Sequence, residues 1–292
     1  MGTRAVALAA GLLLAVVALS LSTAVRKGLA AARPPVVREY ASAAGGRTRA
    51  AFLYTKALSA DRMNLRIRIE RDGKPVFAER VPPYPRPERY APRPGGGEHP
   101  SLFARDLDAD GEPEVFLNLY WGGVHCCWWT RIYSYSAERD TFVPRNHWWG
   151  EARAYYGFRG SLRDLDGDGR PEFSGRDDRF MRLSYFSVDP IRIWSYRAGV
   201  MHDVTRRHPR QVARDALRLW RSYPEARRNG WVRDLLAAWT ADQYLLGQAQ
   251  RTERVLARAV RHGELEGEPL QHPRSGKAWI RVLKRFLRKT GY

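Results

Sequence analysis

The sequence is poor in cysteine, in lysine and in long apolar runs. Its 292 residues include two cysteines, which are adjacent, and only six of its fifty basic residues are lysine. Cys126 and Cys127 can pair only with each other or with another molecule, so a network of structural disulfides is excluded. The sequence also has no phosphate-binding loop, nucleophile elbow or zinc-helix motif, so the common nucleotide, esterase and metalloprotease signatures are absent.

A vicinal disulfide between Cys126 and Cys127 is the first expectation for this pair. Neighbouring Cα atoms lie about 3.8 Å apart, below the roughly 4.4–6.8 Å of ordinary disulfides, so the ring would be strained and would force a tight turn. Two free buried thiols are the alternative. A metal or intermolecular role is a weaker one, because adjacent cysteines give poor tetrahedral geometry.

One apolar run, residues 5–25, stands out near the N-terminus, and no second run of that length follows. It comes after Arg4, and small residues cluster at 22–24 and 30–32, which is typical of an export signal. At helical rise its 21 residues could also cross a bilayer, so segment 1–32 is expected to be a signal peptide or an N-terminal membrane anchor. A secreted or extracytoplasmic location follows, with membrane contact only through such an anchor.

The composition and the spacing of the apolar residues divide residues 33–292 into three parts. Residues 33–49 are rich in Pro, Ala, Gly and Arg and are expected to be a linker. Residues 50–205 contain short alternating segments, such as 63–70 before the turn at 71–74, which predict antiparallel strands. Apolar residues recur at helical spacing over 206–292, where 20 basic residues oppose 8 acidic ones. The expected fold class is therefore α+β, a β-rich domain followed by a basic α-helical region.

Two nine-residue acidic segments, 106–114 and 164–172, are the most specific feature. They read DLDADGEPE and DLDGDGRPE, and their starts are 58 residues apart. Carboxylates at positions 1, 3 and 5 of a tight loop can converge on a cation, glycine at position 6 permits the turn, and position 7 offers a backbone carbonyl. The expected Ca²⁺ ligands are Asp106, Asp108, Asp110, Glu112 and Glu114 in the first loop, and Asp164, Asp166, Asp168, Arg170 and Glu172 in the second.

These loops are not EF-hands, because position 12 is Leu117 in one and Gly175 in the other instead of glutamate. They resemble the FG-GAP/VCBS repeat of integrin-like β-propellers and secreted bacterial proteins, with Phe103 and Leu162 ahead of the loops. The segment 122–127, GGVHCC, is similar to an element of uncharacterised secreted bacterial proteins. The resemblance implies two structural Ca²⁺ sites on strands. Two repeats cannot close a propeller, so a small calcium-pinned sheet domain is expected.

Three functions are compatible with these features. The first is a non-enzymatic, exported binding or adhesion-type module whose basic helices contact an anionic surface or cell-wall polymer. The second is a secreted hydrolase acting on polysaccharide or cell wall, with a cleft lined by aromatic residues around Trp128 and His147. Asp177 and Asp178 could supply its acids, although Arg176 and Arg179 favour salt bridges there. Nucleic-acid binding through the helices is the weakest, since no nucleic-acid module is visible.

Overall fold

The computed structural model describes most of the chain from residue 36 onward. It describes backbone and side chains over residues 47–54, 64–81, 102–118, 130–147, 161–183, 188–267 and 273–292. It describes the backbone alone over residues 36–42, 55–56, 62–63, 93–94, 119–123 and 126–129. The apolar run at 5–25 lies outside these residues. Within them, the helices are too short or too polar to cross a bilayer.

The first sheet is an antiparallel meander of four strands. They are β1 (Val36–Ser42), β2 (Thr48–Lys56), β3 (Arg62–Arg71) and β4 (Lys74–Arg80). The alternation in β3 buries Leu65, Ile67 and Ile69, as the sequence predicts for a half-buried strand. Asp72 and Gly73, at φ +51° and +76°, close the predicted hairpin to β4, because two left-handed residues match the twist of the flanking strands.

Strand β1 lies inside segment 33–49, where composition predicted a linker. It pairs with β2 over its whole length, from Val36 opposite Thr55 to Ser42 opposite Arg49. The pairing uses main-chain groups, which a Pro-, Ala- and Arg-rich composition does not reveal. The structured region therefore begins earlier than residue 50.

The second sheet has its central strand buried on both faces. Its strands are β5 (Arg93–Pro94), β6 (Leu102–Arg105), β7 (Glu114–Gly123), β8 (Cys126–Ser136) and β9 (Thr141–His147). In β7, Val115 and Leu117 pack into the core shared with the first sheet, whereas Phe116 packs into a core shared with the third. This explains why apolar residues follow one another in β7 without alternation.

The third sheet faces Phe116 and carries the second acidic loop. It consists of β10 (Ser161–Arg163), β11 (Glu172–Arg176), β12 (Ile191–Arg197) and β13 (Val200–Asp203), all antiparallel. Phe173, Trp194 and Tyr196 are buried against Phe116, and the rings of Phe116 and Phe173 stack at 5.5 Å between centroids. The contact joins the second and third sheets.

The C-terminal part is helical, as its period predicts. After the short 3₁₀ helices η1 (Asp178–Arg182) and η2 (Thr205–Arg207) come α2 (Pro209–Arg221), α3 (Tyr223–Asn229), α4 (Val232–Leu245), α5 (Ala249–Arg261) and α6 (Gly276–Thr290). Helix α4 is buried on nearly all sides, with Trp239 at its centre. Phe180 of η1 belongs to the same core and attaches the helices to the third sheet.

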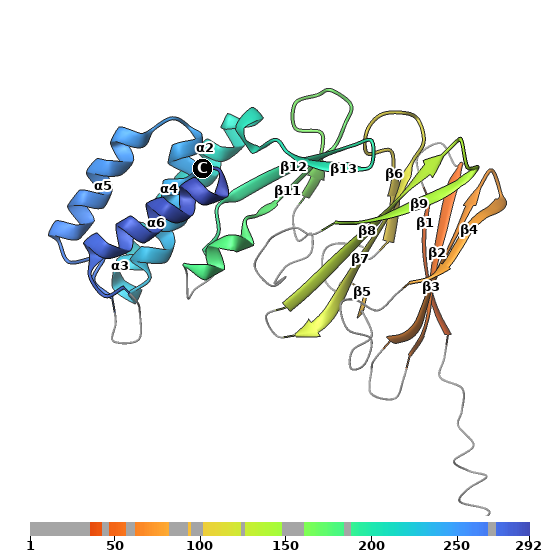
Figure 1. Ribbon diagram of the computed structural model, residues 1–292, viewed down its shortest axis with the longest axis horizontal. Helices are drawn as coiled ribbons and strands as arrows, with labels where there is room; N and C mark the ends of the chain where they lie inside the picture. The colour runs from red at the N-terminus through yellow and green to blue at the C-terminus, as the bar shows by residue number, and fades with distance from the viewer. Residues whose placement is uncertain are drawn as a thin grey trace, which may run out of the picture.

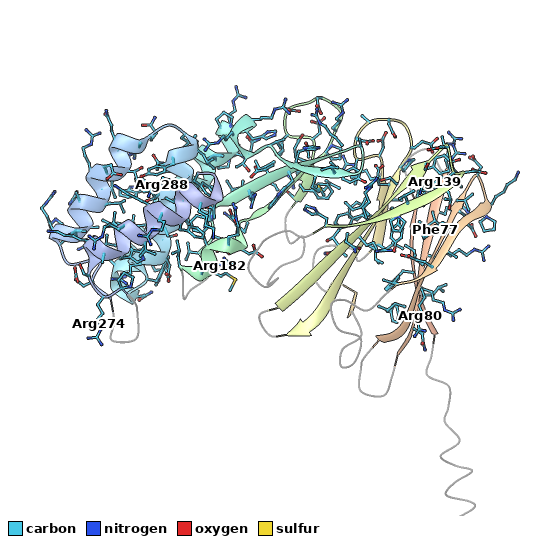
Figure 2. The ribbon with its side chains drawn as sticks, in the orientation of Figure 1. Phe77, Arg80, Arg139, Arg182, Arg274 and Arg288 are labelled. Carbon is cyan, nitrogen blue, oxygen red and sulfur yellow. The ribbon has the colours of Figure 1, made fainter. Side chains whose placement is uncertain are left out.

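The layers follow one another in chain order, from the first sheet at one end to the helices at the other (Figure 1). The α+β prediction, antiparallel sheets followed by C-terminal helices, is confirmed, and the described sheets form no closed barrel or propeller. Exposed arginines project from the sheets, as Arg80 and Arg139 do, and from the helical end, as Arg274 and Arg288 do (Figure 2).

Candidate metal centre

The two acidic loops occupy equivalent places in two hairpins. The first joins β6 to β7 and the second joins β10 to β11, and each closing glutamate is the first residue of the returning strand. Glu114 lies opposite Arg105, and Glu172 lies opposite Arg163, so the two hairpins have the same register. The repeat seen in the sequence is therefore also a repeat of local structure.

The first aspartate of each loop accepts hydrogen bonds from backbone amides later in the same loop. Asp106 accepts a hydrogen bond from the Gly111 amide, and Asp164 accepts one from the Gly169 amide, both at 2.9 Å. The two glycines have φ of +87° and +85°, a left-handed conformation that strains other residues. Backbone donors lower the pKa of the Asp164 carboxyl, the Gly169 amide contributing most. Position 6 is thus glycine for a conformational reason.

The side chains of the closing glutamates accept hydrogen bonds from backbone amides near the start of their own loops. Glu114 accepts from the Leu107 amide at 2.9 Å, and Glu172 accepts from the Leu165 amide at 2.8 Å. Both side chains are almost completely buried, at 2% and 3% exposure. Burial, together with the charge of Asp108, raises the pKa of the Glu114 carboxyl to about 8. Burial also raises the pKa of Glu172. A nearby cation would offset both effects.

Three acidic oxygens converge in each loop. One group consists of Asp106, Asp108 and Glu114, and the other consists of Asp164, Asp166 and Asp168, with one ligand atom from each residue within 4.8 Å of the others. Two oxygens bound to one Ca²⁺ at about 2.4 Å can lie at most about 4.8 Å apart, so both groups have a suitable size. In the first loop Oδ1 of Asp108 is buried without a hydrogen bond.

Asp110 sits beside the first group and not within it. Its carboxylate accepts a hydrogen bond from the Glu112 amide at 2.8 Å, as Asp168 does from the Arg170 amide at 2.9 Å. Burial raises the pKa of Asp110, and the charges of Asp108 and Asp106 act in the same direction. The loop therefore concentrates negative charge that a cation would neutralise.

The position-7 side chains make their hydrogen bonds with neighbouring parts of the fold. Glu112 accepts two hydrogen bonds from Arg71 of the first sheet, at 3.1 and 2.6 Å, and one from Arg47 at 3.1 Å. The hydrogen bond from Arg71 is the main reason that the pKa of Glu112 is lowered. Arg170 donates from Nε to the carbonyl oxygen of Asp108 at 2.9 Å. At these two positions only the backbone carbonyl remains for the predicted metal contact.

His208 joins the second loop although the sequence did not suggest it. A ring nitrogen of His208 and carboxylate oxygens of Asp166 and Glu172 all lie within 4.8 Å of one another. His208 precedes α2, 36 residues beyond Glu172 in the chain, so no local spacing could indicate the contact. Pro209 marks the helix start in the sequence, but the direction of that start is a property of the fold.

Other candidates from the sequence fall mostly outside the described side chains. The side chains of Cys126 and Cys127 are among those outside, so the vicinal disulfide stays a prediction. The same holds for Trp128 and the other tryptophans of the expected aromatic cleft. His147 is described: burial lowers the pKa of its imidazole to about 4, with a further contribution from Arg192.

The acidic pair Asp177 and Asp178 lies in a buried 3₁₀ turn. Asp177 is bound by Arg179 and accepts from the Tyr292 hydroxyl at 2.7 Å, as the salt-bridge interpretation predicts. Both carboxylate oxygens of Asp178 are buried without a hydrogen bond, so the interpretation does not hold for this residue. Burial, together with the charge of Asp177, raises its pKa to about 7.

A second pair of acids, Asp215 and Asp242, is buried where the helices meet the third sheet. Asp215 binds Arg176 at 2.6 Å and Arg218 at 2.7 Å and accepts from the Ile191 amide at 3.0 Å. Asp242 is completely buried, and burial next to Asp215 raises its pKa to about 9. Burial and the neighbouring charge of Asp215 thus both favour the protonated form of Asp242.

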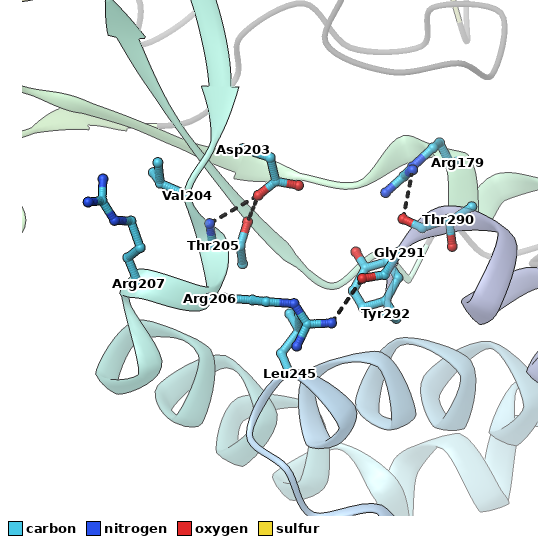
Figure 3. A pocket seen from close by; sticks show the side chains of 10 residues that line it. All are labelled: Arg179, Asp203, Val204, Thr205, Arg206, Arg207, Leu245, Thr290, Gly291 and Tyr292. Atoms are coloured by element: carbon cyan, nitrogen blue, oxygen red, sulfur yellow. Dashed lines mark hydrogen bonds between the residues drawn. The ribbon is translucent and has the colours of Figure 1, made fainter.

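A cavity of about 280 Å³ lies between the third sheet and the end of α6 (Figure 3). Three arginines line it, but Arg179 is bound by Asp177 and donates to the Thr290 carbonyl, and Arg206 donates to the Gly291 carbonyl at 2.9 Å. These contacts engage two of the three arginines, Arg207 being the third, and the acidic loops remain the stronger candidate site.

The comparisons with known proteins are sparse. No family model matches the chain, and no solved structure matches it. A protein of Synechocystis sp., named a probable thylakoid lumen protein, is 28% identical over 168 residues. The matched part is 52% of this chain and 47% of that protein, so the chain spans about half the length of the curated relative.

Proposed function

We propose that the protein is an exported, non-enzymatic module of the binding or adhesion type, in which Ca²⁺ bound in the two acidic loops holds its layers together. The observation that carries the proposal is the pair of loops with equivalent hydrogen bonds, each gathering three carboxylates within 4.8 Å. The buried Oδ1 of Asp108, which has no hydrogen bond, supports a cation in the first loop, since such an oxygen is costly to bury alone.

The position of the loops supports a structural role for the ion. Through Glu112 the first loop contacts Arg71 of the first sheet, and through Arg170 the second contacts the first. Asp108 also accepts a hydrogen bond from the Ala198 amide in the β12–β13 turn, at 3.1 Å. An ion that fixes these loops would therefore fix the contacts between sheets, and its removal would loosen them.

Two observations support an extracytoplasmic location of the protein. The apolar run at 5–25 is typical of export signals, and the similar Synechocystis protein is named for the thylakoid lumen. Ca²⁺ is plentiful outside the cytoplasm, where a loop of moderate affinity stays loaded. The exposed arginines of the helices, among them Arg288, would attract an anionic surface or cell-wall polymer.

The test is thermal unfolding of the full chain with Ca²⁺ and with chelator, together with elemental analysis of the purified protein. We expect bound calcium and a melting temperature that falls on chelation. Asp106→Asn and Asp164→Asn should each remove part of the Ca²⁺-dependent shift, because each loop loses its central carboxylate. Glu138→Gln, in an exposed turn, is the matched control and should leave the shift unchanged. Coincident melting curves with and without Ca²⁺ would refute the proposal.

A further inference from the structure

We propose that the second acidic loop is a mixed nitrogen and oxygen site, in which His208 binds a first-row transition cation of the Zn²⁺ class together with Asp166 and Glu172. The inference rests on the proposed cation binding of that loop and deepens it, because it gives the second loop a ligand set that accepts a transition cation in preference to the Ca²⁺ that its three aspartates can also bind. The three residues come from the loop, from the start of β11 and from the residue that precedes α2.

The geometry of the three groups suits one ion. Their ligand atoms lie within 4.8 Å of one another. Zn²⁺ binds imidazole and carboxylate at about 2.0–2.2 Å, so two of its ligand atoms lie at most about 4.4 Å apart, a limit that rotation of one exposed carboxylate can meet. Asp166 is exposed and can rotate toward the ion, whereas Glu172 and His208 form a buried base beneath it. The site thus has an open side through which an ion can enter and a fixed side that positions it.

The imidazole of His208 is the observation that points to a ligand. His208 is 4% exposed, and within the described part of the chain its ring makes no hydrogen bond. An imidazole without a hydrogen-bond partner keeps a ring nitrogen available as a metal ligand. Its backbone is fixed, because its amide donates to the Thr205 carbonyl at 3.1 Å and its carbonyl accepts from the Val212 amide at 3.2 Å. The backbone that carries the ring is therefore anchored at the start of α2, and the ring lies beside the loop.

The first loop lacks an equivalent nitrogen. Its group consists of carboxylates alone, and its position-3 residue Asp108 is engaged by the Ala198 amide, where Asp166 has His208 nearby. Oxygen-only sites suit hard Ca²⁺, whereas an imidazole raises the affinity for Zn²⁺ and similar cations. Two loops with almost the same sequence therefore differ in metal preference because of one residue outside the repeat.

The experiment compares Ca²⁺, Zn²⁺ and Co²⁺ on tag-free, chelator-treated full-length protein, by titration calorimetry and by the visible absorption of Co²⁺. We expect His208→Gln to weaken Zn²⁺ binding at least tenfold and to change the Co²⁺ spectrum, while Ca²⁺ binding at the first loop changes less than twofold. His202→Gln, an exposed histidine on β13, is the matched control and should behave as the wild type.

Unchanged Zn²⁺ affinity in His208→Gln would overturn the inference and would show that the imidazole only balances the charge of Glu172. If the variant does not fold, the imidazole resonances of the wild type decide, since Zn²⁺ should shift those of His208 and leave those of His202 in place. Stabilisation by Ca²⁺ without a His208 effect would leave the proposed function standing and remove only this inference. A His208-dependent Zn²⁺ site without any Ca²⁺ effect would support this inference and refute the structural role of Ca²⁺.

Discussion

Arg170, at position 7 of the second acidic loop, donates from Nε to the carbonyl oxygen of Asp108 in the first, at 2.9 Å. The two loops are 58 residues apart in the chain, and this bond makes them one connected unit. The same arginine lies 3.6 Å from Asp168 of its own loop. An ion that orders one loop would therefore affect the other through this side chain.

Replacing Arg170 should uncouple the loops. We expect Arg170→Met to lower the free energy of unfolding by about 1 kcal/mol, the typical net contribution of a hydrogen bond. The variant should also reduce any cooperativity between two Ca²⁺ binding events measured by calorimetry. Arg163→Met is the matched control, because Arg163 is exposed on the neighbouring strand and its side chain makes no hydrogen bond within the described residues. Equal effects of both substitutions would contradict the coupling.

Position 4 is alanine in the first loop and glycine in the second, so exchanging the two residue types tests backbone strain in both directions. Ala109 and Gly167 occupy it with φ of +59° and +84°, and the left-handed region costs a non-glycine residue roughly 1–2 kcal/mol. Gly167→Ala should lower the free energy of unfolding by about 1 kcal/mol, and Ala109→Gly should raise it by up to about 1 kcal/mol after the entropy of glycine is counted. Chemical denaturation in chelator measures both, and effects of the same sign would contradict the strain argument.

The pair Asp215 and Asp242 should respond asymmetrically to amide substitution. The raised pKa of Asp242 favours its neutral form, so we expect Asp242→Asn to keep the charge state and to change the free energy of unfolding by less than about 1 kcal/mol. Asp215→Asn removes the charged partner of Arg176 and Arg218, whose side chains are 43% and 49% exposed, and should cost about 2 kcal/mol, as for hydrogen bonds to a charged group. Denaturation at pH 7 compares the two variants, and similar losses would show that Asp242 is ionised.

Asp178 should make the protein less stable as the pH rises. Its pKa is about 7 in the fold against 3.8 ordinarily, so the folded state holds a proton between these values that the unfolded state releases. The free energy of unfolding should therefore fall between pH 4 and pH 7 by up to about 4 kcal/mol and level off above pH 7. Asp178→Asn should reduce this slope, whereas Glu225→Gln, an exposed control on α3, should keep it. An unchanged slope in Asp178→Asn would assign the dependence to other groups, among them Asp189, whose pKa is also raised to about 7.

Much of the fold is readable from the sequence because it depends on local patterns. Alternation over 63–70 predicted β3, and the change of period after Pro209 predicted the helices. Strand β1 was missed because main-chain pairing leaves no trace in composition. At the site, the loop residues followed from spacing, whereas the contacts of Arg170 with Asp108 and of His208 with Glu172 depend on how separate layers pack. No pattern within one segment carries that information.

Strand β7 is buried on both faces, and each layer packs on the one that precedes it in the chain. Such an order suits a polypeptide that folds while it emerges in one direction, since every new layer finds its support already made. The apolar face of the first sheet, with Ile67 and Ile69, would then be the first apolar surface to appear, and it stays uncovered until β6 and β7 arrive. That surface therefore stays exposed until the hairpin that carries the first acidic loop has formed.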